Sequence, residues 1–484
     1  MRGGQARVLA CMVLCHALLM ATGIRAQALP VEVTAALRAA GIPPGAVAVE
    51  VRALDAADPA PLKVRHNAAA ALNPASVMKL VTAYAALDLL GPAAVWMTEV
   101  RADVLPDASG RLHGNLYLKG GGDPKLTQDA FQALLRQLRA LGVTRIEGDL
   151  VLDRSFFQLA EQDPGAFDGR PQRAYNVGAD ALLLDFRALR FTLMPEADGV
   201  RVRQDSPSAG VLADFRLSLA QGSCDGWRDR LGLRIVPGAA GEPDRLEARG
   251  GYPRSCGEKT LTLAPLSAER HAEGLFRALW AELGGSFTGR ARSGTMPEQA
   301  IPLVWQASPP LAEIVRDMNK WSNNVMARQL FLTLDEHQPK TEAGARQRLT
   351  RWLADKGFHF PEFWVENGAG LSRTARISAT HLVQLLTDAW QSPLMPEFAA
   401  ALPLAGVDGT MKSRLRETLA QGRARVKSGT LSGVKSLAGY AQDGSGHWYA
   451  LAFLINHPNA AAGGAAMDHL LLWVVQGCPQ DAVR

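Results

Sequence analysis

A long β-rich stretch, residues 95–296, interrupts this chain and sets limits on how it can fold. Short runs in which apolar and polar residues alternate, such as 112–118 and 150–152, are separated there by Gly, Pro and Asp turns. That pattern is typical of strands. The segments before and after the stretch mix strand patterns with helical spacing. We therefore expect the two flanking segments to fold together as one α/β domain into which the stretch is inserted.

The flanking segments contain strands and helices in both parts of the chain. Alternating residues predict two antiparallel strands at 46–54 and 62–66, and a buried helix begins after Asn73-Pro74. Near the C-terminus, a Gly-rich turn between two of three alternating runs predicts a β-meander. The remaining helical patterns lie at 311–334, 341–356, 378–390 and 460–475, and the meander runs lie at 423–431, 436–442 and 447–455.

The residue pattern of the insert changes near Leu182, after which short runs of alternating apolar and polar residues surround two cysteines. This change predicts two inserted β-rich domains rather than one. The expected organisation is a signal peptide at 1–28, an α/β domain from 29–94 and 297–484, a first inserted domain from 95–181 and 264–296, and a second from 182–263.

The N-terminus has the order of features found in a secretory signal peptide. Arg2 and Arg7 precede an apolar run, 8–24, and small residues follow around Ala26 and Ala28. A membrane anchor is the alternative, because this run approaches the length of a spanning helix. The basic and small-residue flanks favour cleavage, so the chain is expected to be exported to the periplasm without an integral membrane anchor.

Charge and cysteine content narrow the function classes. The formal net charge of +5 falls to +2 without residues 1–28, which contain three basic and no acidic residues, so no nucleic-acid partner is expected. In an oxidising compartment, Cys224 and Cys256 frame a local loop and are predicted to form a disulfide, whereas Cys478 is expected to be free. Neither a Cys-x-x-Cys motif nor a histidine cluster is present, so no metal or cofactor is expected.

Ser76-Val77-Met78-Lys79 is the first candidate for chemistry. Positions i and i+3 of a helix share one face, so the Lys79 amine can reach the Ser76 hydroxyl and act as its base. The helix N-terminus also favours a developing negative charge beside Ser76. Taken alone, the motif equally describes a solvated helix lysine, and a second copy, Ser432-Gly433-Val434-Lys435, lies in a predicted turn.

Two further motifs follow in the C-terminal segment. Ser322-Asn323-Asn324 interrupts the amphipathic pattern of 311–334, and an ordinary polar kink would explain it equally well. Lys427-Ser428-Gly429-Thr430 lies on a predicted strand, where an edge lysine and a turn glycine are common. Each motif is weak alone. Their order, with the first at a helix start, the second in a helical region and the third on a strand, is a strong joint signal.

This combination resembles the penicillin-recognising serine enzymes. Asn323 replaces the usual Asp and Ser428 the usual Thr, so β-lactamases fit less well. The long, β-rich separation of Ser76 from Ser322 is similar to that of the class C penicillin-binding proteins, the D-Ala-D-Ala carboxypeptidase and endopeptidase family. The resemblance implies a DD-peptidase/β-lactamase-like transpeptidase domain, with an antiparallel sheet flanked by helices, and two inserted β-rich domains. Supporting matches are Gly120 to Pro124 and Gly368 to Arg373, with Ala369 where the family usually has Ser.

The resemblance also implies roles for individual residues. Ser76 would be the nucleophile and Lys79 its base, while Ser322 would pass a proton to the leaving amine. The substrate would be held by Asn324, by Lys427 and Ser428 at its terminal carboxylate, by Gly429 through close approach, and by the backbone N–H groups of Ser76 and Thr430. Arg373 and, through a looser match, Asp168 resemble residues that line the substrate cleft, where the acid faces a diamino-acid side chain. A solvated loop aspartate explains Asp168 equally well.

The implied function is serine D-alanyl-D-alanine carboxypeptidase or endopeptidase activity on peptidoglycan stem peptides, through an acyl-enzyme on Ser76 that β-lactams also form. Two alternatives remain open. The first is a catalytically idle wall-binding or β-lactam-sensing protein, although every reactive group is present. The second is a β-lactamase, for which no deacylating glutamate is evident. A homodimer is compatible with the sequence, which has no feature that requires one.

Overall fold

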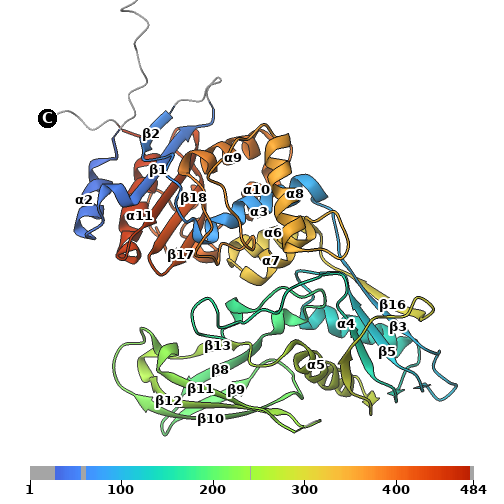
Figure 1. The fold of residues 1–484 in the computed structure, drawn as a ribbon. Helices are drawn as coiled ribbons and strands as arrows, with labels where there is room; N and C mark the ends of the chain where they lie inside the picture. Colours follow the sequence, from blue (N-terminus) through green and yellow to red (C-terminus); the bar gives the residue numbers. More distant parts are fainter. Residues whose placement is uncertain (1–27, 56–61, 240, 480–484) are drawn as a thin grey trace, which may run out of the picture.

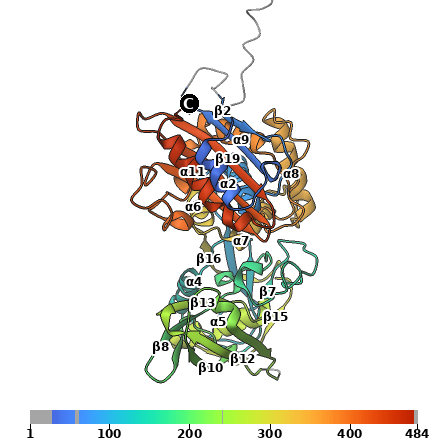
Figure 2. The same cartoon turned by 90° about the vertical axis from the view of Figure 1, so that its left-hand side faces the viewer.

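The computed structural model describes residues 28–55, 62–239 and 241–479 (Figure 1). All but the last residue of the predicted signal peptide lies outside the described residues. An α/β lobe is built from both ends of the chain, and the middle of the chain forms a second lobe beside it (Figures 1 and 2). Within the described parts, none of the helices is both long and apolar enough to cross a bilayer.

The α/β lobe is organised around a five-stranded sheet with the order β17-β18-β19-β1-β2. The central pairing joins the ends of the chain, because β1 runs antiparallel to β19 with Val49 opposite Phe453. The two flanking segments therefore share one sheet, as predicted. Its strands are β1 (Val47–Ala53), β2 (Leu62–His66), β17 (Ala424–Leu431), β18 (Val434–Gln442) and β19 (Trp448–Asn456).

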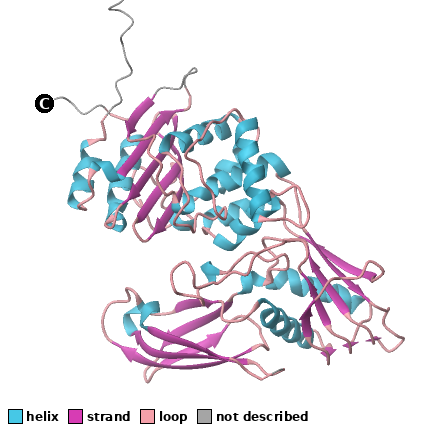
Figure 3. Cartoon of the chain, in the orientation of Figure 1, coloured by secondary structure: helices cyan, strands magenta, loops and turns pink. Residues whose placement is uncertain are grey.

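Helices cover both faces of this sheet (Figure 3). On one face, α2 (Val31–Ala39) and α11 (Gly464–Val475) pack against Leu451 and Phe453 of β19. The other face packs on a helical layer around α3 (Met78–Leu90), which is apolar on all sides and therefore lies at the centre of that layer. The rest of the layer is α6 (Leu311–Lys320), α7 (Asn324–Thr333), α8 (Glu342–Asp355), α9 (Ala379–Gln391) and α10 (Met395–Ala401).

The first inserted unit is a five-stranded sheet with the order β15-β7-β5-β3-β16. Its core includes Phe131 of α4 (Gln128–Ala140) and Trp280 of α5 (Ala268–Glu282). The strands are β3 (Met97–Ala102), β5 (Leu116–Gly120), β7 (Leu150–Asp153), β15 (Ala291–Ser293) and β16 (Ile301–Ala307). A small sheet, β14-β6-β4, adjoins them, formed by Ser286–Phe287, Arg145–Ile146 and Arg111–Leu112.

The expected boundary at 296/297 assigns β16 to the α/β domain, but β16 pairs with β3 along its length, with Ala307 opposite Met97. The chain thus enters and leaves the insert on neighbouring strands. We therefore propose that the insert extends to about residue 307. The sequence could not indicate this, because an alternating pattern predicts a strand without identifying the strand that it pairs with.

The second inserted unit consists of two three-stranded sheets, β13-β8-β9 and β10-β12-β11. Aromatic side chains fill its core, among them Phe191, Trp227 and Tyr252. Cys224 and Cys256 form a disulfide beside this core. The strands are β8 (Leu189–Pro195), β9 (Val200–Gln204), β10 (Val211–Ala220), β11 (Leu231–Val236), β12 (Asp244–Pro253) and β13 (Lys259–Leu263).

Gly120, at the end of β5, offers a test of how the insert is packed. A Cβ atom at this position would overlap the backbone of Ala181 and Leu182. We expect Gly120→Ala to lower the free energy of unfolding by about 2–4 kcal/mol, the range of an overpacking substitution against rigid backbone. Denaturant titration would measure it. Gly45→Ala is the matched control, since a Cβ there meets nothing within 4 Å, and equal stabilities for the two variants would contradict the packing.

Candidate active site

Ser76 lies in a 3-10 turn, η2 (Ala75–Val77), that leads directly into α3. The sequence had predicted that Ser76 lies in the first turn of the α-helix itself. The tighter turn follows from Ala75, whose φ is +46°, and from Pro74, whose carbonyl accepts a hydrogen bond from Val77 N at 3.1 Å. The i and i+3 relation is nevertheless preserved, because Lys79 Nζ lies 3.1 Å from Ser76 Oγ.

Lys79 is buried with 0 % of its surface exposed. Besides Ser76, its Nζ donates to Asn324 Oδ1 at 2.7 Å and to the carbonyl oxygen of Ala369 at 2.6 Å. Burial lowers the Lys79 pKa well below its ordinary value, and the positive charges of Lys427 and Arg328 lower it further. A neutral amine in this position can accept the proton of the Ser76 hydroxyl.

The Ser322-Asn323-Asn324 motif forms the break between α6 and α7. Ser322 has a φ of +55°, which ends the helical course of α6. The Asn323 side chain caps α7 by accepting hydrogen bonds from Val325 N and Met326 N. Asn324, the first residue of α7, thereby faces Lys79. The kink that could have been an ordinary helix break therefore positions two polar groups at the site.

The third motif lies on β17, at the edge of the sheet. Lys427 is buried, and its Nζ donates to Ser322 Oγ at 2.9 Å and to the Ser428 carbonyl at 2.7 Å. Burial lowers the Lys427 pKa to about 7. Ser428 Oγ donates to Thr410 Oγ1 at 3.1 Å, and Thr430 is exposed. Residues 403–405 pair with the first part of the outer edge of β17, through the bridge of Leu404 with Arg425. The later part of this edge strand carries a titratable cation and two hydroxyl groups.

Gly429 is predicted to let a substrate approach β17 closely, and it also allows β17 to pack against the turn that carries Ser76. A Cβ atom there would overlap Ser436 Oγ and lie 2.9 Å from both Pro74 O and Ser76 N. Ser436 Oγ also donates to Pro74 O at 2.6 Å. A glycine is therefore required for β17 to pack against the turn that carries Ser76.

Arg373 and Asp168 lie on the side of the site formed by the insert. Arg373 Nη1 donates to Ser432 O at 3.1 Å, and its guanidinium lies 4.5 Å from the centroid of the Phe167 ring. Asp168 accepts hydrogen bonds from Tyr175 Oη at 2.7 Å and from the Asn176 side chain at 2.8 Å. Burial alone would raise the Asp168 pKa, but these hydrogen bonds lower it.

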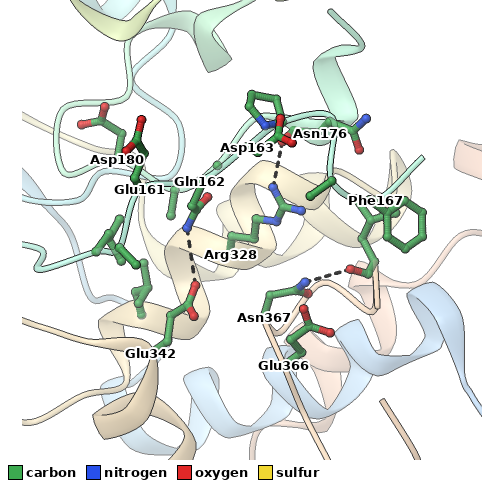
Figure 4. A pocket seen from close by; sticks show the side chains of 18 of the residues that line it. Glu161, Gln162, Asp163, Phe167, Asn176, Asp180, Arg328, Glu342, Glu366 and Asn367 are labelled. Atoms are coloured by element: carbon green, nitrogen blue, oxygen red, sulfur yellow. Dashed lines mark hydrogen bonds between the residues drawn. The ribbon is translucent and has the colours of Figure 1, made fainter. Parts of the chain in front are cut away.

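The insert and the motifs meet at Asn324, whose Nδ2 donates to the Tyr175 carbonyl at 3.3 Å. We call residues 154–188, between β7 and β8, the insert loop. A cavity of about 930 Å³ lies between this loop and α7, with Phe167, Arg328 and Arg373 among its lining residues (Figure 4). Asp168 does not line this cavity itself, but its neighbour Phe167 and its hydrogen-bond partner Asn176 do. The Asp168 side chain is hydrogen-bonded to Tyr175 and Asn176, and these bonds hold the loop in place at the rim of the site.

Three groups at this site were not identified from the sequence. Ala369 contributes its carbonyl, so the absent serine side chain at that position does not matter for holding Lys79. Arg328 could have been found, because it lies four residues after Asn324, on the same face of α7. No sequence pattern indicated Thr410, because a single threonine in a loop is compatible with many roles. Among the described residues, no group of three His, Cys, Asp or Glu side chains could hold a metal ion.

Comparisons with known proteins agree with this geometry. The family model described as D-Ala-D-Ala carboxypeptidase 3 (S13) matches residues 33–476. The D-alanyl-D-alanine carboxypeptidase of Actinomadura sp. (strain R39) is 31% identical over 412 residues, which cover 79% of this chain and 73% of that protein. D-alanyl-D-alanine carboxypeptidase DacB of Haemophilus influenzae is 25% identical over 355 residues, covering 72% and 73%. The crystal structure of penicillin binding protein 4 (dacB) from H. influenzae has the same fold, with a TM-score of 0.73, 22% identity, and coverage of 91% of this chain and 100% of that one.

The depressed Lys427 pKa predicts a pH-dependent cost in stability. Between the folded pKa of about 7 and the unfolded value of 10.5, the unfolded chain binds more protons, so this group makes the free energy of unfolding rise with pH. Below about pH 7 its penalty is constant and largest. We expect Lys427→Met to raise the free energy of unfolding at pH 7 by about 2–4 kcal/mol, after allowing for two lost hydrogen bonds.

Thermal and denaturant unfolding at pH 6–10 would measure this effect. The matched control is Lys412→Met, because Lys412 is exposed and no burial penalty applies to it. Lys427→Met should also flatten the rise of stability with pH. A variant less stable than the wild type at every pH, with the same slope, would show that the Lys427 amine is not penalised by burial.

Proposed function

The chain belongs to the D-Ala-D-Ala carboxypeptidase 3 (S13) family, and we propose that it is a serine D-alanyl-D-alanine carboxypeptidase that acts on peptidoglycan stem peptides through an acyl-enzyme on Ser76. The observation that carries this proposal is the contact of the buried Lys79 amine with Ser76 Oγ at 3.1 Å. The second hydrogen-bonded pair, Lys427 with Ser322, lies on the neighbouring strand and helix break.

In the proposed acylation step, neutral Lys79 accepts the Ser76 proton while Oγ attacks the carbonyl carbon of the penultimate D-Ala. The carbonyl oxygen becomes an oxyanion that the backbone N–H groups of Ser76 and Thr430 stabilise. Ser322 then gives its proton to the nitrogen of the leaving D-Ala as the peptide bond breaks and regains a proton from the Lys79 ammonium, so that Lys79 is neutral again. Water hydrolyses the ester by the reverse proton path, with Lys79 again as the base.

Recognition of the substrate would use the outer edge of β17 beyond Val426, past the residues that pair with 403–405. Protonated Lys427 and the Ser428 hydroxyl bind the terminal carboxylate, and Thr410 orients Ser428 through their 3.1 Å hydrogen bond. The Asn324 side chain accepts a hydrogen bond from Lys79 through Oδ1 and donates one to the Tyr175 carbonyl through Nδ2. It therefore links the base to the insert. A substrate lying against β17 thus places its scissile carbonyl beside Ser76.

The endopeptidase activity and acylation by β-lactams belong to the same proposal, because both use the same attack on a carbonyl beside a carboxylate. A catalytically idle wall-binding protein is disfavoured by the lowered Lys79 pKa, which a sensor of stem peptides does not need. A fast β-lactamase would need a second base for deacylation. Incubation with a fluorescent penicillin distinguishes the three functions. Stable labelling of Ser76 supports the peptidase, rapid turnover of the penicillin supports a β-lactamase, and absence of labelling supports an idle binding protein.

We also propose that the protein works after export, in the periplasm. The order of basic, apolar and small residues at the N-terminus supports a signal peptide, and the Cys224–Cys256 disulfide suits an oxidising compartment. Peptidoglycan is found on that side of the membrane.

Ser76→Ala tests the nucleophile against a matched control in the same chain. We expect D-Ala release from a pentapeptide to fall by at least about 10³-fold and penicillin labelling to disappear, since covalent catalysis is lost. Ser432→Ala alters the second Ser-x-x-Lys sequence, whose turn contacts Arg373 through its backbone, and should retain wild-type rates. Mass mapping of the adduct to any residue other than Ser76 would contradict the mechanism.

The Lys427 pKa of about 7 predicts how substrate binding depends on pH. A carboxylate is bound by the protonated amine, so KM for a D-Ala-D-Ala peptide should rise as the pH increases through about 7. The effect on kcat should be smaller, because the bound carboxylate favours the protonated form. Initial rates at pH 5.5–9 would measure both constants. A peptide whose terminal carboxylate is an amide is the control, and the same rise in KM for both peptides would exclude this role for Lys427.

A further inference from the structure

A second pocket, of about 220 Å³, lies where the insert loop meets the second inserted unit. We call it the arginine pocket, because Arg170, Arg173 and Arg228 line it. Asp229 is the acidic residue on its wall. The pocket therefore has an excess of positive charge.

The single carboxylate is shared by two of the arginines. Asp229 Oδ1 lies 2.8 Å from Arg170 Nη1 and 3.1 Å from Arg173 Nη2. Arg228 instead stacks on the Trp227 ring, at 4.6 Å from its centroid, and donates to Thr260 O at 3.4 Å. Among the residues that the structure describes, no ion pair involves Arg228. Its guanidinium thus lies beside Arg173 without a carboxylate of its own.

The surroundings strengthen this positive field. Leu231 and Leu233 line the pocket with apolar surface, and Leu231 is buried. Partial burial and the charge of Arg173 lower the Arg228 pKa, and the charge of Asp229 offsets part of this effect. A bound carboxylate or phosphate would relieve the repulsion and form charge-assisted hydrogen bonds with guanidinium groups.

The pocket is connected to the candidate active site by a short series of contacts. Asn324 donates to the Tyr175 carbonyl, Tyr175 donates to Asp168, and Asp168 accepts from the backbone N–H of Arg170 at 3.1 Å. The arginine pocket thus lies beyond the loop that the sequence predicted to face the diamino-acid side chain. The same loop therefore borders both the candidate active site and the arginine pocket.

We propose that the arginine pocket binds an anionic group of the stem peptide upstream of the diamino acid, namely the α-carboxylate of the γ-linked D-glutamate. The inference rests on the proposed function, because it takes the stem peptide as the substrate. The terminal carboxylate is already assigned to Lys427, and the D-glutamate carboxylate is the next acidic group upstream of the diamino acid. The pocket would select long, natural peptides over short ones without touching the reacting atoms.

The test compares two pentapeptides that differ only in whether the D-glutamate carboxylate is free or amidated. For the purified full-length chain, we expect kcat/KM to favour the free carboxylate by about five- to tenfold, the effect of partly exposed charge-assisted hydrogen bonds. Arg228→Gln and Arg170→Gln should each bring this ratio toward one. An acetylated tripeptide of diamino acid, D-Ala and D-Ala lacks the carboxylate, so all these proteins should hydrolyse it equally.

Arg230→Gln is the matched control, because Arg230 lies in the same turn but donates to Asp225 O outside the pocket, and it should keep the wild-type ratio. Calorimetric binding of the two pentapeptides to Ser76→Ala supplies a readout without catalysis. A wild-type ratio of one, or an unchanged ratio in both pocket variants, would overturn the inference. Preferential binding by Ser76→Ala, with no hydrolysis by the wild type, would instead reject the proposed function and leave the pocket's role standing.

Discussion

Two lysine amines that are both fully buried are the constraint around which this site is arranged. Burying a charged amine is costly unless it is neutralised or hydrogen-bonded, and among the described residues neither the Lys79 nor the Lys427 amine contacts a carboxylate. Each is instead surrounded by neutral oxygens from the turn of Ser76, the break before α7, the Ala369 carbonyl and β17. The same burial that costs stability lowers the Lys79 pKa and favours the neutral amine, which can accept the proton of a hydroxyl.

The inserted units act on this site through one loop. Arg328 of α7 donates to the carbonyls of Asn176 and Val177, and Asn324 donates to that of Tyr175, so the loop is tied to the helix that carries the second motif. The α/β lobe can therefore supply the chemistry while the insert shapes the surface that a substrate meets. This division explains how a long insertion is compatible with a catalytic fold.

The sequence was most informative where the signal is local. Strand alternation and turn residues predicted the hairpin of β18 and β19, and the spacing of Ser76 and Lys79 predicted a contact that the structure contains. It was least informative about which distant strands pair, because the pairing of β16 with β3 cannot be read from an alternating pattern. Residues such as Thr410 and Ala369 gave no signal, because their contribution is a position or a carbonyl rather than a side-chain type.

The residue types and their order along the chain were enough to identify a serine, two lysines and an asparagine as one chemical set, because each motif begins or interrupts an element in a recognisable way. Folding settled everything that depends on distance and burial. It removed Lys79 and Lys427 from water, turned Asp168 toward Tyr175 and Asn176, and brought three arginines from two separate segments to one pocket. A pKa or a pocket is a property of neighbours brought together from remote parts of the chain, and a linear pattern does not contain those neighbours.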